Sequence, residues 1–334
     1  MKLGRQLGAA VLAALLNLVT TQVRAEVVAD IAAAPVLDDH YPSAKVSFGT
    51  DVESYPDVVF STLQGFRPLR LDIYRQVASN TPRPLVIYIH GGGWQSGHTR
   101  HAGAFSNWPS VLASLARKGY VVASIEYRLS SEAKFPAAIQ DVKTAIKWLR
   151  ASAKKYSIDT SKTIVWGGSA GGQLAALAAT SCGVEALAPE IADKTVAAQS
   201  DCVQGLVAWY GVFDFSTIPE LNSGANSPGN RYLGCSSTQC ADKVALASPI
   251  AQLDSKDPPT LLIHGETDKV VPANQSRAFD AALRAKGVPS ELIVIPAVDH
   301  SFIGSTPEAT RQASLQALSK TFAFIDAVSG GKRE

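Results

Sequence analysis

The amino-acid sequence predicts an α/β fold in which a mostly parallel central sheet carries helices on both faces. From residue 85 onward, short apolar runs alternate with longer stretches of helical spacing, a pattern typical of a parallel sheet with crossover helices. Some runs, such as residues 85–89, are apolar at every position, which indicates strands buried on both faces. The 334 residues, 46% of them hydrophobic, are sufficient for one large core. We therefore expect one domain, at residues 56–330.

The start of the chain predicts a secretory signal peptide at residues 1–25. Basic residues precede an apolar run at 7–19, and Ala25 ends a short segment suited to cleavage. The run has about 13 residues, fewer than the roughly 20 that span a bilayer. We therefore expect a periplasmic or secreted protein that keeps no stable membrane anchor after cleavage. Residues 26–55, rich in Ala, Asp and Pro without a sustained period, predict a linker or arm.

The charge balance gives no indication of a polyanionic partner. The chain has 31 Lys and Arg residues against 29 Asp and Glu, for a net charge of +2, and no block of basic residues. Binding to nucleic acid or to an anionic membrane surface usually depends on such a block. We expect neither partner.

Four cysteines, all in the second half of the chain, allow three pairings in an exported protein. Local spacing favours a bond between Cys235 and Cys240 within a polar loop. This leaves Cys182 to pair with Cys202, joining the end of one helix to the start of the next strand. The cysteine and histidine spacings do not match a zinc site, so we expect structural disulfides and no metal.

The predicted strands are short apolar or β-branched runs bounded by turn residues. The first two form an antiparallel hairpin, because Gly65 and Pro68 separate them. The later strands are the buried, parallel ones. Strands are expected at residues 58–63, 69–74, 85–89, 120–125, 163–165, 203–210, 260–264 and 291–295.

The predicted helices carry apolar residues on one face, which packs on the sheet. In the stretch 136–156, for example, Ile139, Val142, Ile146 and Leu149 recur at helical spacing. Helices are expected at residues 111–118, 136–156, 174–180, 274–286 and 307–328.

The strongest functional signal is a G-x-S-x-G sequence at residues 167–171, between a predicted strand and a predicted helix. A serine on such a tight turn needs neighbours without side chains, and Gly167, Gly171 and Gly172 meet that need. The turn exposes the Ser169 hydroxyl as a nucleophile. It also directs the Ala170 amide and the positive end of the new helix toward a developing oxyanion.

A second signal is the run of three glycines after the buried strand 85–89, in the sequence His90 to Trp94. Backbone amides approach a ligand closely only where side chains are absent. A plain loop is the alternative, but the presence of the G-x-S-x-G motif in the same chain favours function. His90 is expected to hold this loop by hydrogen bonds and not to act as a catalytic base.

A nucleophilic serine needs an imidazole base and a carboxylate that orients it. Of six histidines, His300 follows the last predicted strand and precedes an apolar residue, so it is the candidate base. Asp268 follows the strand before it and is the candidate acid, with Glu266 as its rival. Asp299 is less suitable, because adjacent side chains diverge. The carboxyl ends of parallel strands meet at one edge of a sheet, so Ser169 should join this group.

Aromatic residues near the strand ends predict a substrate pocket, although such residues belong to the core as often as to a pocket wall. The candidates are Trp94, Tyr127, Trp209 and Phe213. Residues 213–248, rich in Ser, Gly, Asn and Pro, are longer than an ordinary connection. They predict an insertion that forms a small cap over the site.

These motifs resemble those of the α/β-hydrolase superfamily, and within it the hormone-sensitive-lipase-like and bacterial feruloyl- or acetylxylan-type carboxylesterases. The resemblance spans roughly residues 45–328 and rests on the ordered segments 90–94, 167–172, 264–268 and 299–302. It implies an α/β-hydrolase fold, with Asp268 as the acid and an oxyanion hole built by the amides of Gly92, Gly93 and Ala170, with the Gly91 amide as an alternative donor.

Two residues depart from the resembled pattern without touching the predicted triad. Glu126 stands where the lipase-like group often has Asp, and Asp299 stands where Gly is more common before the histidine. Both leave the subfamily open.

The resemblance implies a serine carboxylesterase that hydrolyses short-acyl or aryl esters through an acyl-enzyme on Ser169, and the predicted signal peptide implies that it is exported. The resemblance also implies a small-molecule ester substrate and no cofactor. An arylformamidase or other amidase with the same triad is an alternative. A catalytically inactive, ligand-binding member of the fold is a weaker one, because such proteins usually lose the serine or the histidine, and this chain keeps both.

Overall fold

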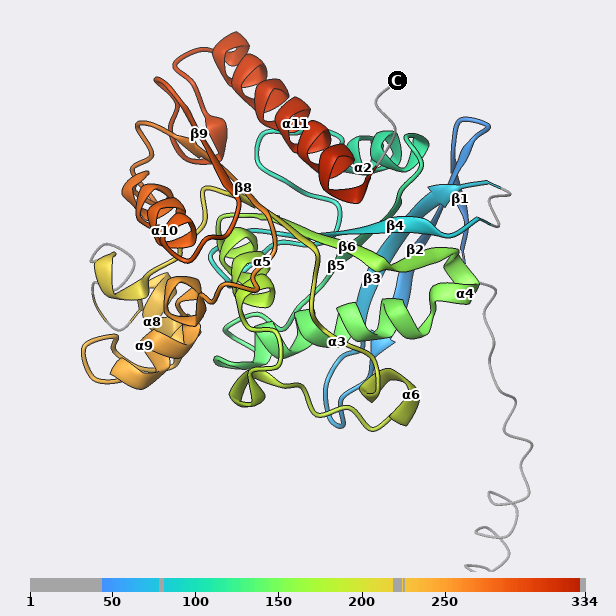
Figure 1. Cartoon of the computed structure of the whole chain (residues 1–334), viewed down its shortest axis with the longest axis horizontal. Helices are drawn as coiled ribbons and strands as arrows, with labels where there is room; N and C mark the ends of the chain where they lie inside the picture. The colour runs from blue at the N-terminus through green and yellow to red at the C-terminus, as the bar shows by residue number, and fades with distance from the viewer. Residues whose placement is uncertain (1–43, 78–80, 219–223, 225, 331–334) are drawn as a thin grey trace, which may run out of the picture. The chain divides into compact units, whose positions relative to one another are not determined.

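The structure of the chain, a computed structural model, describes residues 44–77, 81–218, 224 and 226–330 (Figure 1). The predicted signal peptide and the first part of the predicted arm, up to residue 43, lie outside the described residues.

Among the described residues, nine strands form one sheet in the order β1-β2-β3-β5-β4-β6-β7-β8-β9. The pairs β1–β2, β2–β3 and β3–β5 are antiparallel. All neighbours from β5 to β9 are parallel, as the alternation of strands and helices predicted. The strands are β1 (Val46–Phe48), β2 (Val52–Ser61), β3 (Leu69–Gln76), β4 (Arg83–Ile89), β5 (Val121–Ile125), β6 (Ile158–Gly168), β7 (Gly205–Trp209), β8 (Thr260–Gly265) and β9 (Ser290–Ile295).

Helices cover both faces of the sheet (Figure 1). One face carries α2 (Trp108–Arg117) and α11 (Pro307–Ser329), and the other carries α3 (Ala137–Ala151), α5 (Ala170–Thr180) and α10 (Asn274–Ala285). Within the described part of the chain, no helix has both the length and the apolar character needed to cross a bilayer.

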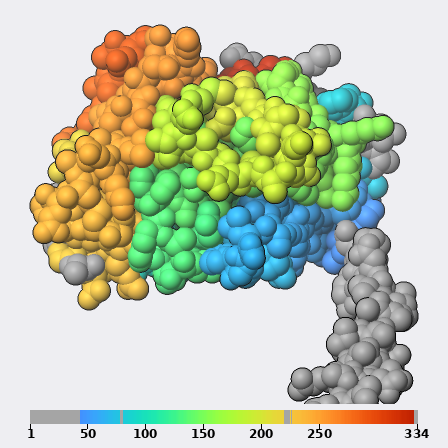
Figure 2. Space-filling model, turned by 90° about the horizontal axis from the view of Figure 1, so that it is seen from below, coloured from blue at the N-terminus to red at the C-terminus, as the bar shows by residue number. Residues whose placement is uncertain are grey.

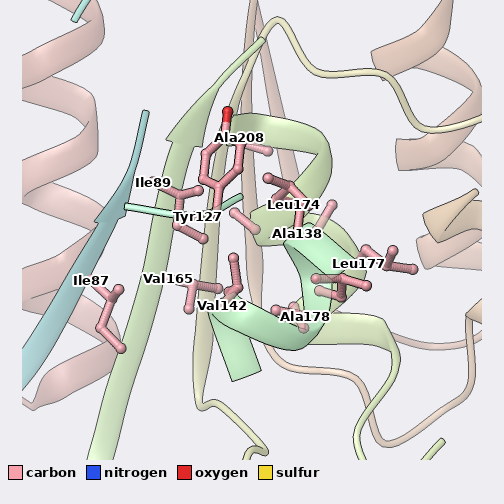
Figure 3. Packing of buried hydrophobic residues seen from close by; sticks show 14 of the residues in the cluster. Ile87, Ile89, Tyr127, Ala138, Val142, Val165, Leu174, Leu177, Ala178 and Ala208 are labelled. Carbon is pink, nitrogen blue, oxygen red and sulfur yellow. The ribbon is translucent and has the colours of Figure 1, made fainter. Parts of the chain in front are cut away.

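The core divides into two layers because successive strand residues point to opposite faces. In β4, Val86 and Tyr88 pack in the layer under α2 and α11. Ile87 and Ile89 of the same strand pack in the layer under α3 and α5, where Figure 3 shows Val142 and Leu174 facing the sheet. Each central strand is therefore buried on both sides, which explains its continuous apolar sequence.

The sheet begins earlier than the sequence predicted. The arm was expected to extend to residue 55, but Val46 pairs with Ser54 and Ser47 with Glu53, so β1 and the start of β2 already belong to the sheet. Residues of β1 are exposed or half-buried, as is usual for an edge strand. They lack the apolar pattern by which a strand is identified.

The predicted helix 136–156 is interrupted near its end. Helix α3 ends at Ala151, and a separate turn, α4 (Ala153–Tyr156), follows. Ser157 then adopts a left-handed backbone conformation with φ 57°, which turns the chain into β6.

The predicted insertion lies between β7 and β8 and is built from short helices. Residues 219–223 and 225 of this segment lie outside the described residues. The described elements are η2 (Phe215–Thr217), α8 (Pro228–Leu233), α9 (Ala241–Ala247) and η3 (Pro249–Gln252).

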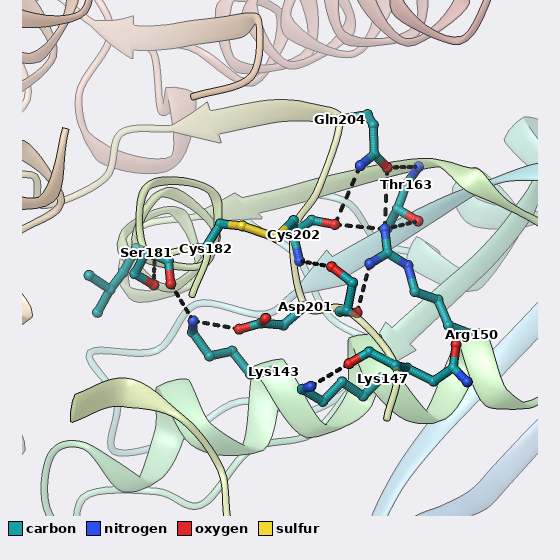
Figure 4. The surroundings of a disulfide bond; sticks show 12 residues. Lys143, Lys147, Arg150, Thr163, Ser181, Cys182, Asp201, Cys202 and Gln204 are labelled. Atoms are coloured by element: carbon teal, nitrogen blue, oxygen red, sulfur yellow. Dashed lines mark hydrogen bonds and ion pairs between the residues drawn. A yellow bond between two sulfur atoms is a disulfide. The ribbon is translucent and has the colours of Figure 1, made fainter. Parts of the chain in front are cut away.

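Both predicted disulfides are present. Cys235 is bonded to Cys240 between α8 and α9, and Cys182 is bonded to Cys202 in the connection from α5 to β7. Figure 4 shows Lys143 and Arg150, two cations of α3, beside the two ends of the Cys182–Cys202 disulfide. Lys143 donates to the carbonyl of Ser181, at 2.6 Å. The segment between Cys182 and Cys202 includes α6 (Lys194–Ala197). It is yellow-green in Figure 2, where it covers a broad part of the visible surface.

Candidate active site

Ser169 occupies a sharp turn between the end of β6 and the start of α5. Its backbone has a positive φ of 56°, and its N–H donates to the carbonyl of Trp209, at 2.9 Å. A Cβ at Gly167 would lie 2.2 Å from the carbonyl oxygen of Gly171, and one at Gly171 would lie 2.0 Å from that of Ile89. Side chains are therefore excluded at both positions, as the sequence predicted.

The structure brings Ser169, His300 and Asp268 together at the carboxyl edge of the sheet. His300 Nε2 lies 2.9 Å from Ser169 Oγ, and His300 Nδ1 lies 2.7 Å from Asp268 Oδ2. His300 begins the short helix η4 (His300–Phe302) after β9, and Asp268 lies in the turn after β8. The Asp268 carboxylate accepts a hydrogen bond from Nδ1–H of His300, which leaves Nε2 unprotonated and able to take the Ser169 hydroxyl proton.

The Asp268 side chain has no solvent-exposed surface. Burial by itself would raise the pKa of Asp268, but hydrogen bonds from His264 and His300, and from the Val271 amide, hold that pKa well below its usual range. Its other oxygen, Oδ1, accepts from the amides of Val270 and Val271 at 2.9 and 2.8 Å. The group is thus a fixed, ionised carboxylate at neutral pH.

The glycine loop lies directly beside the serine. Gly92 and Gly93 line the same cavity as Ser169, and a Cβ at Gly91 would lie 3.4 Å from the Ser169 Cβ. In the part of the chain that the structure describes, the amide N–H groups of Gly92, Gly93 and Ala170 have no hydrogen-bond acceptor. These three predicted donors are therefore available to a ligand.

His90 holds the loop from inside the protein, as predicted. Its Nδ1–H donates to the carbonyl of Gly91 at 2.8 Å, and its ring stacks on Tyr127 with the centroids 4.3 Å apart. Burial lowers the pKa of His90 to about 4, so the ring is neutral at neutral pH. It has no contact with Ser169 that would allow it to act as a base.

A cavity of about 750 Å³ opens over Ser169. None of the described residues that line it is Asp, Glu, Lys or Arg. Nor does the described chain contain a cluster of three or more His, Cys, Asp or Glu side chains that could bind a metal ion. Lining residues that the sequence did not identify include Tyr88, His98, His101, Tyr210, Val270 and Ile303.

The predicted pocket aromatics mostly lie elsewhere. Trp94 lines the cavity, whereas Tyr127, Trp209 and Phe213 are not among its lining residues. Tyr127 donates its hydroxyl to the His90 carbonyl, Trp209 donates to Thr321 Oγ1, and Phe213 packs within the core. The polar groups of Tyr127 and Trp209 are therefore satisfied by partners inside the protein.

Tyr210 is an aromatic lining residue that the pocket prediction did not include. Its ring contacts the His300 ring edge-on, with the centroids 4.8 Å apart. It follows β7, and β7 pairs with β6, the strand that ends directly before Ser169. The order of strands in the sheet would have identified it, but the sequence alone does not supply that order.

The rival carboxylates take no part in the contact with the His300 ring. Glu266 is exposed. Asp299 Oδ1 accepts from the backbone amides of Lys269 and His300 at 2.9 and 2.7 Å. Asp299 therefore joins two loops, while only Asp268 among the three contacts the imidazole.

Comparison with known proteins gives a family match over most of the domain. Residues 71–283 match the model of the BD-FAE family. The chain is 34% identical over 244 residues to Esterase LipQ of Mycobacterium tuberculosis, covering 71% of this chain and 55% of that protein. It is also 34% identical to Esterase LipC of the same organism, covering 64% and 52%. The chain thus spans about half the length of these relatives.

Solved structures of similar fold include a bifunctional GH43-CE protein of Bacteroides eggerthii, with 32% identity and a TM-score of 0.71 over 83% of this chain and 38% of that one. A truncated carbohydrate esterase from gut microbiota matches at 27% identity and a TM-score of 0.73, covering 86% of this chain and all of its own. These likenesses confirm the predicted fold class.

Proposed function

This chain belongs to the BD-FAE family, and we propose that it is an exported serine carboxylesterase that hydrolyses short-acyl or aryl esters through an acyl-enzyme on Ser169. The observation that carries the proposal is the 2.9 Å contact between His300 Nε2 and Ser169 Oγ, backed by the 2.7 Å contact between His300 Nδ1 and Asp268. The relatives that are named esterases support the same reaction class.

In the first half of the proposed reaction, Ser169 Oγ attacks the ester carbonyl carbon while His300 Nε2 takes its proton. Asp268 stabilises the imidazolium that forms. The negative charge that develops on the carbonyl oxygen faces the amides of Gly92, Gly93 and Ala170. Because these donors are already in place, their stabilisation requires little reorganisation.

The imidazolium of His300 then gives its proton to the departing alcohol oxygen, and the acyl group stays on Ser169. In the second half, a water molecule takes the place of the alcohol. His300 removes its proton as it attacks the acyl carbon, and the same amides stabilise the second oxyanion. The imidazolium of His300 then returns this proton to Ser169 Oγ as the bond between Oγ and the acyl carbon breaks, which releases the carboxylic acid and restores the serine hydroxyl.

The absence of Asp, Glu, Lys and Arg from the described residues that line the cavity favours esters that carry no charge. A charged group entering this cavity would lose hydration without meeting an Asp, Glu, Lys or Arg among the described lining residues. Trp94 and Tyr210 offer flat apolar surface, and His98 and Ser96 offer polar contacts. A neutral short-acyl or aryl ester fits this chemistry.

The direct test is hydrolysis by purified protein. We expect release of p-nitrophenol from p-nitrophenyl acetate and longer acyl esters, and loss of that activity in Ser169→Ala. The same assay with p-nitroacetanilide separates ester from amide chemistry. Preferential cleavage of the anilide would favour the amidase alternative, and ester hydrolysis by Ser169→Ala at the wild-type rate would refute the proposal.

Export is the second part of the proposal. It rests on the apolar run at residues 7–19 and on the two disulfides, because such bonds persist in oxidising compartments.

A further inference from the structure

We propose that His264 is a positioning residue for Asp268, and that Ser276 sets the tautomer in which it acts. This inference rests on the proposed function, since it concerns the acid of the same site. His264 lies at the end of β8, and its ring is fully buried behind the carboxylate. It does not reach the cavity, so it would act only through Asp268.

The contacts of His264 involve both ring nitrogens. Nε2 lies 2.8 Å from the carbonyl oxygen of Val271 and 3.3 Å from Asp268 Oδ2. Nδ1 lies 2.6 Å from Ser276 Oγ, which belongs to α10. The ring therefore spans from the first turn of α10 to the carboxylate that contacts His300.

These contacts determine where the hydrogen lies. The Val271 carbonyl and the ionised Asp268 carboxylate can only accept hydrogen bonds, so Nε2 of His264 must carry the proton that they share. Nδ1 is then an acceptor, and Ser276 Oγ is the donor that it faces. A serine hydroxyl at this position thus favours the tautomer that donates to Asp268.

The result is a connected series of polar contacts from the protein interior to the nucleophile. Ser276 donates to Nδ1 of His264, Nε2–H of His264 donates to the Val271 carbonyl and lies 3.3 Å from Asp268 Oδ2, and His300 donates to the same oxygen of Asp268 from the other side. Ser169 donates to the far nitrogen of His300. Asp268 Oδ2 therefore divides its negative charge between two imidazoles.

Sharing the oxygen has two consequences for the site. The second donor fixes the orientation of a carboxylate whose other oxygen is already held by two backbone amides. It also weakens the attraction of Asp268 for a proton on His300. Without His264, the full charge of Oδ2 would face His300 and favour the imidazolium, which cannot accept the proton of Ser169.

The other titratable groups near these contacts leave the argument unchanged. The Tyr210 ring contacts His300, but burial raises the pKa of Tyr210 far above neutral, so its phenol carries no charge. Asp299 accepts from backbone amides, and Lys269 Nζ lies 3.8 Å from its carboxylate. Among the described residues, the Asp268 carboxylate is the one charged group in contact with His264.

The test compares two substitutions at His264 in the full chain. His264→Gln keeps an N–H donor near the position of Nε2, whereas His264→Leu removes it at similar size. We expect His264→Leu to lose about tenfold in kcat/KM for p-nitrophenyl acetate, which corresponds to about 1.4 kcal/mol. We also expect the acidic limb of its pH profile to move to higher pH. His264→Gln should recover most of the rate and return the limb toward that of the wild type.

A second readout does not depend on turnover. The rate at which a fluorophosphonate labels Ser169, measured against pH, should show the same upward shift in His264→Leu. The matched control is Thr321→Val, which removes a buried hydrogen bond to Trp209 elsewhere in the core. It should lower Tm and leave both pH profiles in place.

Equal losses in the Gln and Leu variants, with an unmoved acidic limb, would overturn the inference and leave His264 as a purely structural residue. If His264→Leu does not fold, Ser276→Ala decides, because it removes only the donor to Nδ1. A smaller loss with an upward shift supports the inference, and an unchanged profile refutes it. Wild-type protein that neither hydrolyses esters nor reacts with the fluorophosphonate would instead refute the proposed function.

Discussion

Asp268 and Glu266 stand two residues apart in the turn after β8 and lie in opposite surroundings. The Asp268 side chain is wholly buried and lies 2.7 Å from Nδ1 of His300, whereas Glu266 is exposed. The sequence left both as candidate acids. The geometry places only Asp268 against the imidazole.

Replacing these two carboxylates should therefore have unequal effects. Asp268→Asn keeps the shape of the side chain but removes the charge that stabilises imidazolium and favours the wrong tautomer of His300, so we expect a loss of about 10⁴-fold in kcat. Glu266→Gln should remain close to the wild type. Steady-state kinetics on one p-nitrophenyl ester checks both, and the reverse order would move the role to Glu266.

A second prediction concerns acid stability and His90. The pKa of His90 is lowered to about 4 by burial, against about 6.5 for a free imidazole. Between these values the unfolded chain binds a proton that the folded protein refuses, so stability falls as the pH drops from about 6.5 toward 4. His90→Asn offers an N–H to the Gly91 carbonyl without titrating. Its Tm should fall less steeply over this range, and an unchanged slope would show that His90 does not cause the acid sensitivity.

The buried cation at the Cys182–Cys202 disulfide leads to a third prediction. Lys143 is fully buried and lies 2.6 Å from Asp201 Oδ2 (Figure 4). Lys143→Met leaves that carboxylate without its partner, so we expect a loss of about 3 kcal/mol in the free energy of unfolding. Adding Asp201→Asn should recover part of it.

Lys147 provides the control for this experiment. It lies one turn further along α3 and donates to the carbonyls of Ala197 and Gln199, but it has no carboxylate partner among the described residues. Lys147→Met should cost less, as measured by urea denaturation. Equal losses for the two lysines, with no recovery in the double variant, would argue against a buried ion pair as the source.

The fold and the proximity of the three candidate site residues could be predicted because they depend on local sequence signals. Buried parallel strands have apolar residues throughout, and polar residues directly after them mark the carboxyl edge of the sheet. Ser169, Asp268 and His300 each stand at such a position. Because all three residues stand after parallel strands, they meet at the same edge of the sheet.

The cavity wall could not be predicted in the same way, because an aromatic residue at a strand end faces the core or the ligand depending on contacts distant in sequence. Trp209 faces the core, where Thr321 of α11 accepts from its indole N–H, while its neighbour Tyr210 faces the cavity. Nor could the sequence show that Asp299 binds backbone amides. That role depends on the turn that carries Lys269 lying beside η4.

Asp299 gives a fourth prediction. Its carboxylate joins the amide of Lys269 to that of His300, and its side chain is one-third exposed, at 34%. Asp299→Asn keeps an acceptor oxygen and should retain most of the activity, whereas Asp299→Gly should lower kcat by about tenfold through a less fixed His300. The acidic limb should stay in place in both variants. A clear downward shift in both would show that the Asp299 charge acts on the imidazole ring directly.

A fifth prediction concerns processing of the N-terminus. When the full chain is expressed in a bacterium with a Sec pathway, the mature protein should begin at Glu26 and should be recovered from the periplasm or the medium. Mass spectrometry of unreduced peptides should find both disulfides. An intact N-terminus, or free thiols at all four cysteines, would contradict export.

The central claim is that Ser169 is the nucleophile, and its most direct measurement is the site of covalent trapping. Purified protein is reacted with a fluorophosphonate, and the adduct is located by peptide mass spectrometry while ester hydrolysis is followed. We predict a single adduct, on Ser169, that forms in step with the loss of activity and is absent from Ser169→Ala. An adduct on another residue, or full hydrolysis by protein modified at Ser169, would contradict the claim.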